Sequence, residues 1–138
     1  RGEALNELLV ELWEGGGADR VGEVLRRNRT LVNSTGTDGL TPLYVACLQR
    51  HLEVARVLLD HGADTDRADG QGMTPLRIAC CGGDRDLARL LLSRGADANK
   101  ADDDGSTPLY VACKFGHLEV ARLLLDAGAD KEKADARG

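Results

Sequence analysis

The sequence predicts an all-α protein, a solenoid of stacked helix-turn-helix units that are joined by short loops. Three observations lead to this fold class. Thr-Pro pairs begin at residues 41, 74 and 107, a constant period of 33 residues. Each pair opens a segment with helical spacing of its apolar residues, and each segment closes with Gly-Ala-Asp. A fixed period of this size is typical of repeat proteins, in which every unit buries its apolar side against its neighbours.

The repeated segments are closely similar in sequence. Residues 41–64 read TPLYVACLQRHLEVARVLLDHGAD, residues 74–97 read TPLRIACCGGDRDLARLLLSRGAD, and residues 107–130 read TPLYVACKFGHLEVARLLLDAGAD. With TPLYVA or TPLRIA at the start and GAD at the end, these segments resemble ankyrin repeats, strongly from residue 36 onward and weakly before it. The resemblance implies an ankyrin-repeat solenoid that binds a partner protein or peptide and performs no chemistry.

The register of the repeat divides the chain into five parts. An N-terminal capping helical pair, which is a degenerate repeat, is expected at 1–35; ankyrin repeats are expected at 36–68, 69–101 and 102–134, and the start of a further repeat at 135–138. We therefore expect repeats to continue beyond residue 138 in a longer protein. Without them the apolar side of the third repeat would lack a cover, which favours end-to-end self-association.

The N-terminal part is predicted to contain two helices without the Thr-Pro opening. The first is indicated by leucines with helical spacing, at Leu5, Leu8, Leu9 and Leu12, and the glycines at 15–17 end it. A second helix is expected to start at Asp19 and to bury Val21, Val24 and Leu25. Trp13 is interpreted as a bulky plug at the end of the stack or, alternatively, as a partner contact.

Each full repeat is predicted to begin with a capped helix. The N-caps are threonines whose hydroxyls can accept a backbone N–H, at Thr41, Thr74 and Thr107. Proline follows at the first helical position, where no N–H is needed. This first helix should run to about residue 49, 82 or 115, and a turn at 50–51, 83–84 or 116–117 should reverse the chain. The second helix should end at a glycine in the left-handed conformation, at Gly62, Gly95 or Gly128.

The segments between repeats are rich in Asp and Gly and are predicted to form tight reversals, and the resemblance to ankyrin repeats implies that they are finger loops. An Asp-x-x-Gly signature starts at Asp69 and again at Asp102, and its residue types favour a tight reversal. In the first copy Gly36 stands in place of the aspartate, so a looser turn is expected there.

Charge and cysteine content exclude several classes of partner and site. The net charge of −5 disfavours nucleic acid and anionic membranes, and no apolar run approaches the roughly 20 residues that span a bilayer. Cys47, Cys80 and Cys113 occupy one repeat position and are expected to be buried and reduced, which favours the cytoplasm, with the nucleus as the alternative. A strained bond between Cys80 and Cys81 is the minor alternative.

No motif of an enzyme or a cofactor site is present. His51 and His117 share a repeat position with Asp84, which indicates a capping position, and His61 lies near a helix C-terminus. No Cys-x-x-Cys pair occurs, and the run of aspartates at 102–104 lacks the spacing of a calcium loop. We therefore predict neither cofactor, metal nor catalytic activity.

Positions that differ between copies are the candidates for recognition. In the ankyrin family the partner meets the finger tips and the exposed side of the first helix. Matched to this chain, the candidate partner-binding residues are Leu40, Tyr44, Leu48, Gln49, Gln71, Met73, Arg77, Cys81, Ser106, Tyr110, Lys114 and Phe115, with Thr37, Asp38, Asp103 and Asp104 at finger tips. Several are apolar where exposure is expected, which is typical of an interaction surface. Packing against the next repeat is the equally weighted alternative.

One position departs from the family pattern. The family motif TPLH carries a histidine that links neighbouring repeats, whereas this chain has Tyr44, Arg77 and Tyr110 there. We expect these side chains to reach into the groove, either with Arg77 stacked between the tyrosines or as an acidic-peptide site centred on Arg77.

The function predicted from the sequence is a protein–protein interaction module within a longer chain. One alternative is a non-catalytic regulatory domain of a larger enzyme. Another is a structural spacer or an engineered scaffold without a natural ligand, which the near-identical copies at 41 and 107 support. The irregular middle copy, with its paired cysteines and Gly82-Gly83, argues against a uniform design.

Overall fold

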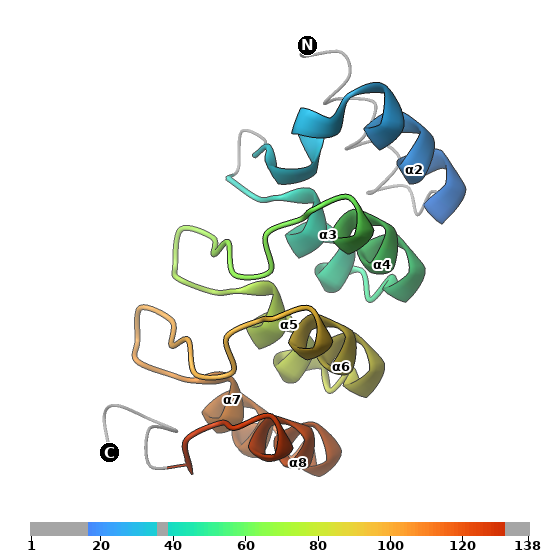
Figure 1. Ribbon diagram of the computed structural model, residues 1–138. Coiled ribbons are helices and arrows are strands. Elements are labelled where there is room, and N and C mark those ends of the chain that lie inside the picture. Colours follow the sequence, from blue (N-terminus) through green and yellow to red (C-terminus); the bar gives the residue numbers. More distant parts are fainter. Residues whose placement is uncertain (1–16, 36–38, 132–138) are drawn as a thin grey trace. The chain divides into compact units, whose positions relative to one another are not determined.

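The computed structural model describes residues 17–35 and 39–131 and divides into two compact units, residues 1–64 and 65–138. All elements assigned in these described ranges are helices, which confirms the predicted fold class (Figure 1). Three predicted features lie outside the described residues: the helix with Leu5 to Leu12 and Trp13, the finger residues 36–38, and the start of a further repeat at 135–138.

The first unit contains four helical segments. Helix α2 (Ala18–Arg27) is followed by the 3-10 helix η1 (Arg29–Asn33), α3 (Pro42–Leu48) and α4 (Leu52–Asp60). Helix α2 packs against α4, and η1 packs against α3. As predicted, α2 buries Val21, Val24 and Leu25, and it begins one residue before Asp19.

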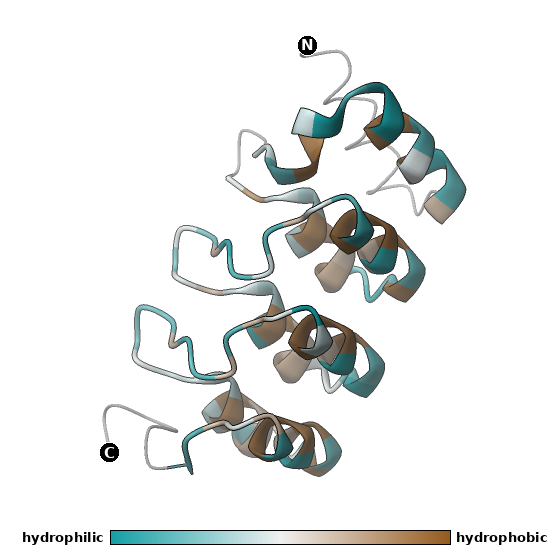
Figure 2. Ribbon diagram, viewed as in Figure 1, coloured by the Kyte–Doolittle hydropathy of each residue, from teal (hydrophilic) through white to brown (hydrophobic). Residues whose placement is uncertain are grey.

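The second unit contains two helix pairs. They are α5 (Pro75–Gly82) with α6 (Arg85–Ser93), and α7 (Pro108–Lys114) with α8 (Leu118–Asp126). Helix α5 packs against α7 and α6 packs against α8 (Figure 1). The core consists of aliphatic side chains that are completely buried, among them Leu76, Leu87, Leu91 and Leu124. In this unit apolar residues are concentrated in the helices, and the connecting loops are mostly hydrophilic (Figure 2).

The predicted helix caps are confirmed. The hydroxyls of Thr41, Thr74 and Thr107 accept the backbone N–H three residues later at 3.2, 3.2 and 3.3 Å, and a proline occupies the first helical position each time. At the second helices the N-caps are His51, Asp84 and His117. Among these three described residues only Asp84 caps through its side chain, which accepts the Leu87 N–H at 3.1 Å.

The turns also agree with the prediction. Arg50, Gly83 and Gly116, each directly before a second helix's N-cap, have φ of 57°, 69° and 74°. The glycines that follow the second helices, Gly62, Gly95 and Gly128, have φ of 92°, 94° and 94°. Local residue chemistry therefore sets the ends of most helices.

Side-chain amides and carboxylates link successive copies within each unit. In the second unit the Oδ1 atom of Asn99 accepts the Asp130 N–H at 2.7 Å, and Asp66 Oδ1 accepts the Asp97 N–H at 3.0 Å. In the first unit Asn33 binds the Asp64 N–H in the same way, at 2.7 Å. All three bonds span 31 residues, so the equivalent positions 33, 66 and 99 serve as the link in these three copies.

We expect Asn99→Ala to lower the free energy of unfolding by about 0.5–1.5 kcal/mol, because it removes one hydrogen bond at a partly solvated site. Asn99→Asp should cost less, since Asp66 makes the same bond with a carboxylate oxygen. Urea unfolding of the full chain measures both values. Equal losses for the two variants would show that this bond does not stabilise the link.

The prediction of buried cysteines holds for two of the three equivalent residues. Cys47 and Cys80 are 1% and 0% exposed, but Cys113 is exposed, so the prediction was wrong for Cys113. Cys80 lies on α5, which α7 covers, whereas no described helix covers α7 from its other side. The four cysteines, all in the described ranges, form no disulfide with one another.

Thiol labelling should follow this difference in burial. Burial and, to a lesser extent, the neighbouring Cys81 raise the pKa of Cys80 to about 12, although Arg77 partly opposes the rise. Because the thiolate is the reactive form, Cys80 should label slowest, half-buried Cys81 faster, and exposed Cys113 first. A short maleimide pulse on the native chain, followed by peptide mass spectrometry, measures the order. Equal labelling of Cys80 and Cys113 would contradict the burial pattern.

Candidate functional site

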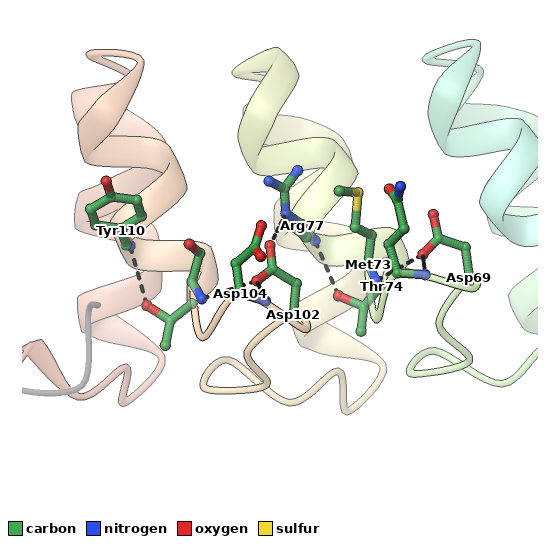
Figure 3. A network of polar contacts seen from close by, with 10 residues as sticks. Asp69, Met73, Thr74, Arg77, Asp102, Asp104 and Tyr110 are labelled. Atoms are coloured by element: carbon green, nitrogen blue, oxygen red, sulfur yellow. Dashed lines mark hydrogen bonds and ion pairs between the residues drawn. The ribbon is translucent and has the colours of Figure 1, made fainter. Parts of the chain in front are cut away.

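The two described finger loops of the second unit are each organised by the carboxylate of their first aspartate. Asp69 Oδ1 accepts the N–H groups of Gln71 and Met73 at 2.8 and 3.0 Å. In the next finger Asp102 Oδ1 accepts those of Asp104 and Ser106 at 2.9 and 3.0 Å (Figure 3). These bonds confirm the tight reversal predicted from Asp-x-x-Gly and fix the backbone of both loop tips.

The two fingers are also joined through their backbones. The Asp103 N–H donates to the carbonyl oxygen of Gln71 at 3.1 Å. Gly72, which follows Gln71 in the chain, has φ of 78°, and a Cβ atom there would lie 2.9 Å from the Asp103 nitrogen. A residue with a side chain would therefore separate the fingers, and glycine is required at position 72.

Arg77 on α5 forms an ion pair with the following finger. Its Nε–H donates to Asp102 Oδ2 at 2.9 Å, and the two side chains are 19% and 2% exposed (Figure 3). Burial tends to raise the pKa of Asp102, but hydrogen bonds from the Ser106 N–H, Arg77 and the Asp104 N–H outweigh it and lower the pKa below its ordinary value of 3.8. The pair thus links α5 to the loop that precedes α7.

Sequence reasoning missed this partner of Arg77. It placed Arg77 between tyrosines or in an acidic-peptide site, whereas in the second unit a carboxylate of the same chain binds the guanidinium. A contact between a cation and an aromatic ring occurs elsewhere among the described residues, where Lys114 Nζ lies over Phe115 at 5.7 Å from the ring centroid. An available signal was the role of the family histidine in linking repeats, because an arginine in its place can make that link to an acidic side chain of the next copy.

The turn between α7 and α8 is held to the preceding helix pair by His117. Its Nε2–H donates to the Cys81 carbonyl oxygen at 3.1 Å, and its ring lies against Gly83. The Phe115 ring lies nearby, with its centroid 6.4 Å from that of His117. His61 in the first unit also bonds a backbone carbonyl, that of Val57, at 2.9 Å. Both imidazoles therefore have structural roles.

The repeat geometry agrees with the comparison to known families. A family model described as ankyrin repeats in three copies matches residues 4–102 and 67–135, which is most of the chain. The chain belongs to the ankyrin-repeat family. Members of this family are generally non-catalytic modules of protein–protein interaction.

Two curated relatives share part of this ankyrin-repeat chain. An ankyrin repeat protein of Acanthamoeba polyphaga mimivirus is 45% identical over 42 residues, which are 30% of this chain and 4% of the relative. The potassium channel AKT3 of Oryza sativa subsp. japonica is 44% identical over 49 residues, 36% of this chain and 5% of the channel. The chain therefore matches only a small part of the length of either relative.

The candidate binding residues of the ankyrin-repeat chain differ widely in exposure. In the first unit Leu48 is 44% exposed, Leu40 and Gln49 are half-buried, and Tyr44 is buried. In the second unit Phe115 is 50% exposed, and Ser106 is buried beneath its finger. We define the finger-helix face as the surface residues of the second unit that follow the fingers and first helices: Gln71, Met73, Arg77, Cys81, Asp104, Tyr110, Lys114 and Phe115.

Neither a membrane-spanning helix nor a metal site occurs among the described residues. None of the helices described is both long and apolar enough to cross a bilayer. Within the same ranges no group of three or more His, Cys, Asp and Glu side chains is arranged to hold a metal ion.

Proposed function

We propose that the ankyrin-repeat chain binds a partner protein or peptide through the finger-helix face and has no catalytic activity of its own. The observation that carries the proposal is a division between shared and variable positions in the second unit. The shared cap residues Thr74 and Thr107 are 1% and 3% exposed. Gln71, Lys114 and Phe115, which differ between copies, are at the surface. Packing thus restricts the residue type at the buried caps, whereas the three surface residues are available for contact with a partner.

The rigidity of the face also supports recognition. The fingers are held by Asp69 and Asp102, by the bond from Asp103 to Gln71, and by the ion pair of Arg77. A preformed surface loses little conformational entropy when it binds, so more of the contact energy contributes to affinity. The exposed Phe115 beside charged side chains has the composition of an interface centre.

Affinity purification with the full chain as bait tests the proposal. The double variant Gln71→Ala/Phe115→Ala removes two exposed side chains of the finger-helix face, and Arg89→Ala removes an exposed side chain of α6 outside it. Proteins captured by the wild type should be retained by Arg89→Ala and lost by the double variant. If the double variant captured the same proteins as the wild type, the proposed face would be wrong.

A second candidate activity is end-to-end self-association through the outer side of α7 and α8. Leu118 and Leu125 are 73% and 46% exposed there, and Cys113 of α7 is exposed as well. Burial of such leucines against a second copy would be favourable. Analytical ultracentrifugation should show a concentration-dependent dimer that Leu118→Glu/Leu125→Glu abolishes. A wild type that stays monomeric at its highest soluble concentration would exclude this association.

We further propose that the segment acts as the recognition part of a longer protein in the cytoplasm or nucleus. Its match to a small part of two longer relatives supports the first point. Fusion of the full-length protein to a fluorescent reporter would test the location.

A further inference from the structure

We infer that the segment recognised by the finger-helix face carries a basic residue next to an apolar one, which bind at Asp104 and Tyr110. The inference rests on the proposed function, because it specifies the chemistry of the partner for the same face. It replaces the expectation of an acidic peptide centred on Arg77.

Arg77 is not the charge that a partner would meet. Its Nε–H is bound to Asp102 at 2.9 Å, and the two side chains are 19% and 2% exposed, so the pair contributes no net charge to the face. An acidic ligand at Arg77 would be repelled by the Asp102 carboxylate, whose other oxygen accepts the backbone N–H groups of Asp104 and Ser106.

Asp104 is a carboxylate of the same finger that this ion pair leaves open. Its side chain is exposed, and no side chain among the described residues pairs with it. Its position is nevertheless fixed, because its backbone N–H is bound by Asp102 at 2.9 Å. The Asp104 carboxylate, the Arg77 guanidinium and the Tyr110 ring all point to the same side of the second unit (Figure 3).

Tyr110 supplies the apolar and aromatic part of the subsite. It is half-buried near the start of α7, and Thr107 binds its backbone N–H at 3.3 Å, so the ring is carried by a fixed helix end. A tyrosine ring offers apolar area to an aliphatic side chain and a negative face to a cation. Together with Asp104 it can therefore hold a lysine or arginine and the apolar residue beside it.

Lys114 gives the bound segment a direction. It lies four residues after Tyr110, on the same side of α7 and about 6 Å further along the helix. The face thus has a negative charge at the finger end and a positive charge at the turn end. Complementary charge orders the ligand with its basic residue at Asp104, its apolar residue at Tyr110 and an acidic residue toward Lys114.

Selection from a random-peptide phage library on the immobilised full chain tests this chemistry. The enriched peptides should contain lysine or arginine beside an apolar residue. Asp104→Asn should weaken binding of a synthetic selected peptide about tenfold in fluorescence anisotropy. Asp86→Asn, which neutralises an exposed carboxylate of α6, should leave its affinity unchanged. Asp104→Lys/Lys114→Glu should select peptides with the opposite order of charges.

Three outcomes would overturn the inference: selected peptides without a basic residue, no enrichment at all, or equal effects of Asp104→Asn and Asp86→Asn. Circular dichroism checks that each variant is folded. The proposed function fails separately, because it depends on whether Gln71→Ala/Phe115→Ala loses the captured proteins, whatever their charge.

Discussion

Asp102→Ala is expected to lower the free energy of unfolding by about 3–5 kcal/mol, the largest effect of any polar substitution proposed for this chain. The variant leaves the Arg77 guanidinium without its carboxylate and the N–H groups of Asp104 and Ser106 without their acceptor. Because the Asp102 side chain is 2% exposed, water cannot readily replace these bonds. Urea unfolding monitored by circular dichroism measures the loss.

Two further variants separate the contributions of Asp102. Asp102→Asn keeps one acceptor oxygen for the loop but removes the charge, so it should cost about 1.5–3 kcal/mol. Asp103→Ala, at the exposed neighbouring position in the same finger, should change stability by at most about 0.5 kcal/mol. A loss for Asp103→Ala as large as that for Asp102→Ala would show that the Asp102 carboxylate is not the group that holds the finger loop together.

The same carboxylate should make stability depend on acidic pH. The pKa of Asp102 is lowered in the folded chain, so its contribution is fully present above the ordinary value of 3.8. It is lost as the pH falls from there through the lower pKa of the folded state. The wild type should therefore lose more stability than Asp102→Asn below that pH, and parallel stability curves for the two proteins would contradict the assignment.

Gly83→Ala is expected to cost about 2–3 kcal/mol. Gly83 has φ of 69°, a left-handed conformation that costs a residue with a side chain about 1–2 kcal/mol. A Cβ atom there would also lie 2.5–2.9 Å from three atoms of the His117 ring, so the ring must move. That movement breaks its hydrogen bond to the Cys81 carbonyl, which adds about 1 kcal/mol.

Alanine substitutions at two other glycines separate the conformational cost from the cost of the contact with His117. Gly95 has φ of 94° with open space around it, so Gly95→Ala should show the conformational cost alone. Gly82 lies in α5 without a positive φ and with nothing near its Cβ position, so Gly82→Ala should be neutral or stabilising by up to about 1 kcal/mol. If Gly83→Ala proved no worse than Gly95→Ala, the contact with His117 would carry no energy.

The sequence predicted those parts of the fold that depend on local chemistry. A threonine hydroxyl caps a helix three residues away, and a glycine closes one at its own position, so Thr74 and Gly95 could be placed without tertiary information. The Asp-x-x-Gly loops were predictable for the same reason, since the Asp69 carboxylate binds N–H groups only two and four residues later.

Features that depend on a neighbouring copy were harder to predict. The exposure of Cys113 was missed because it depends on which helices cover α7. The sequence gives no sign of this difference, since the equivalent residue in the other two repeats is also a cysteine. The partner of Arg77 lies 25 residues away, and the link of Asn99 spans 31, so neither follows from local pattern. For the candidate site, the sequence placed Phe115, Gln71 and Lys114 at the surface, but it also included Tyr44 and Ser106, which are buried.

The bond between the fingers has a consequence for how recognition could diversify. It joins the carbonyl of Gln71 to the N–H of Asp103, and neither group belongs to a side chain. The side chains at 71 and 103 can therefore be exchanged without loss of this connection, whereas residue 72 between them must stay glycine. New specificities could arise on this surface by substitution at its tips while the supporting main chain keeps its conformation.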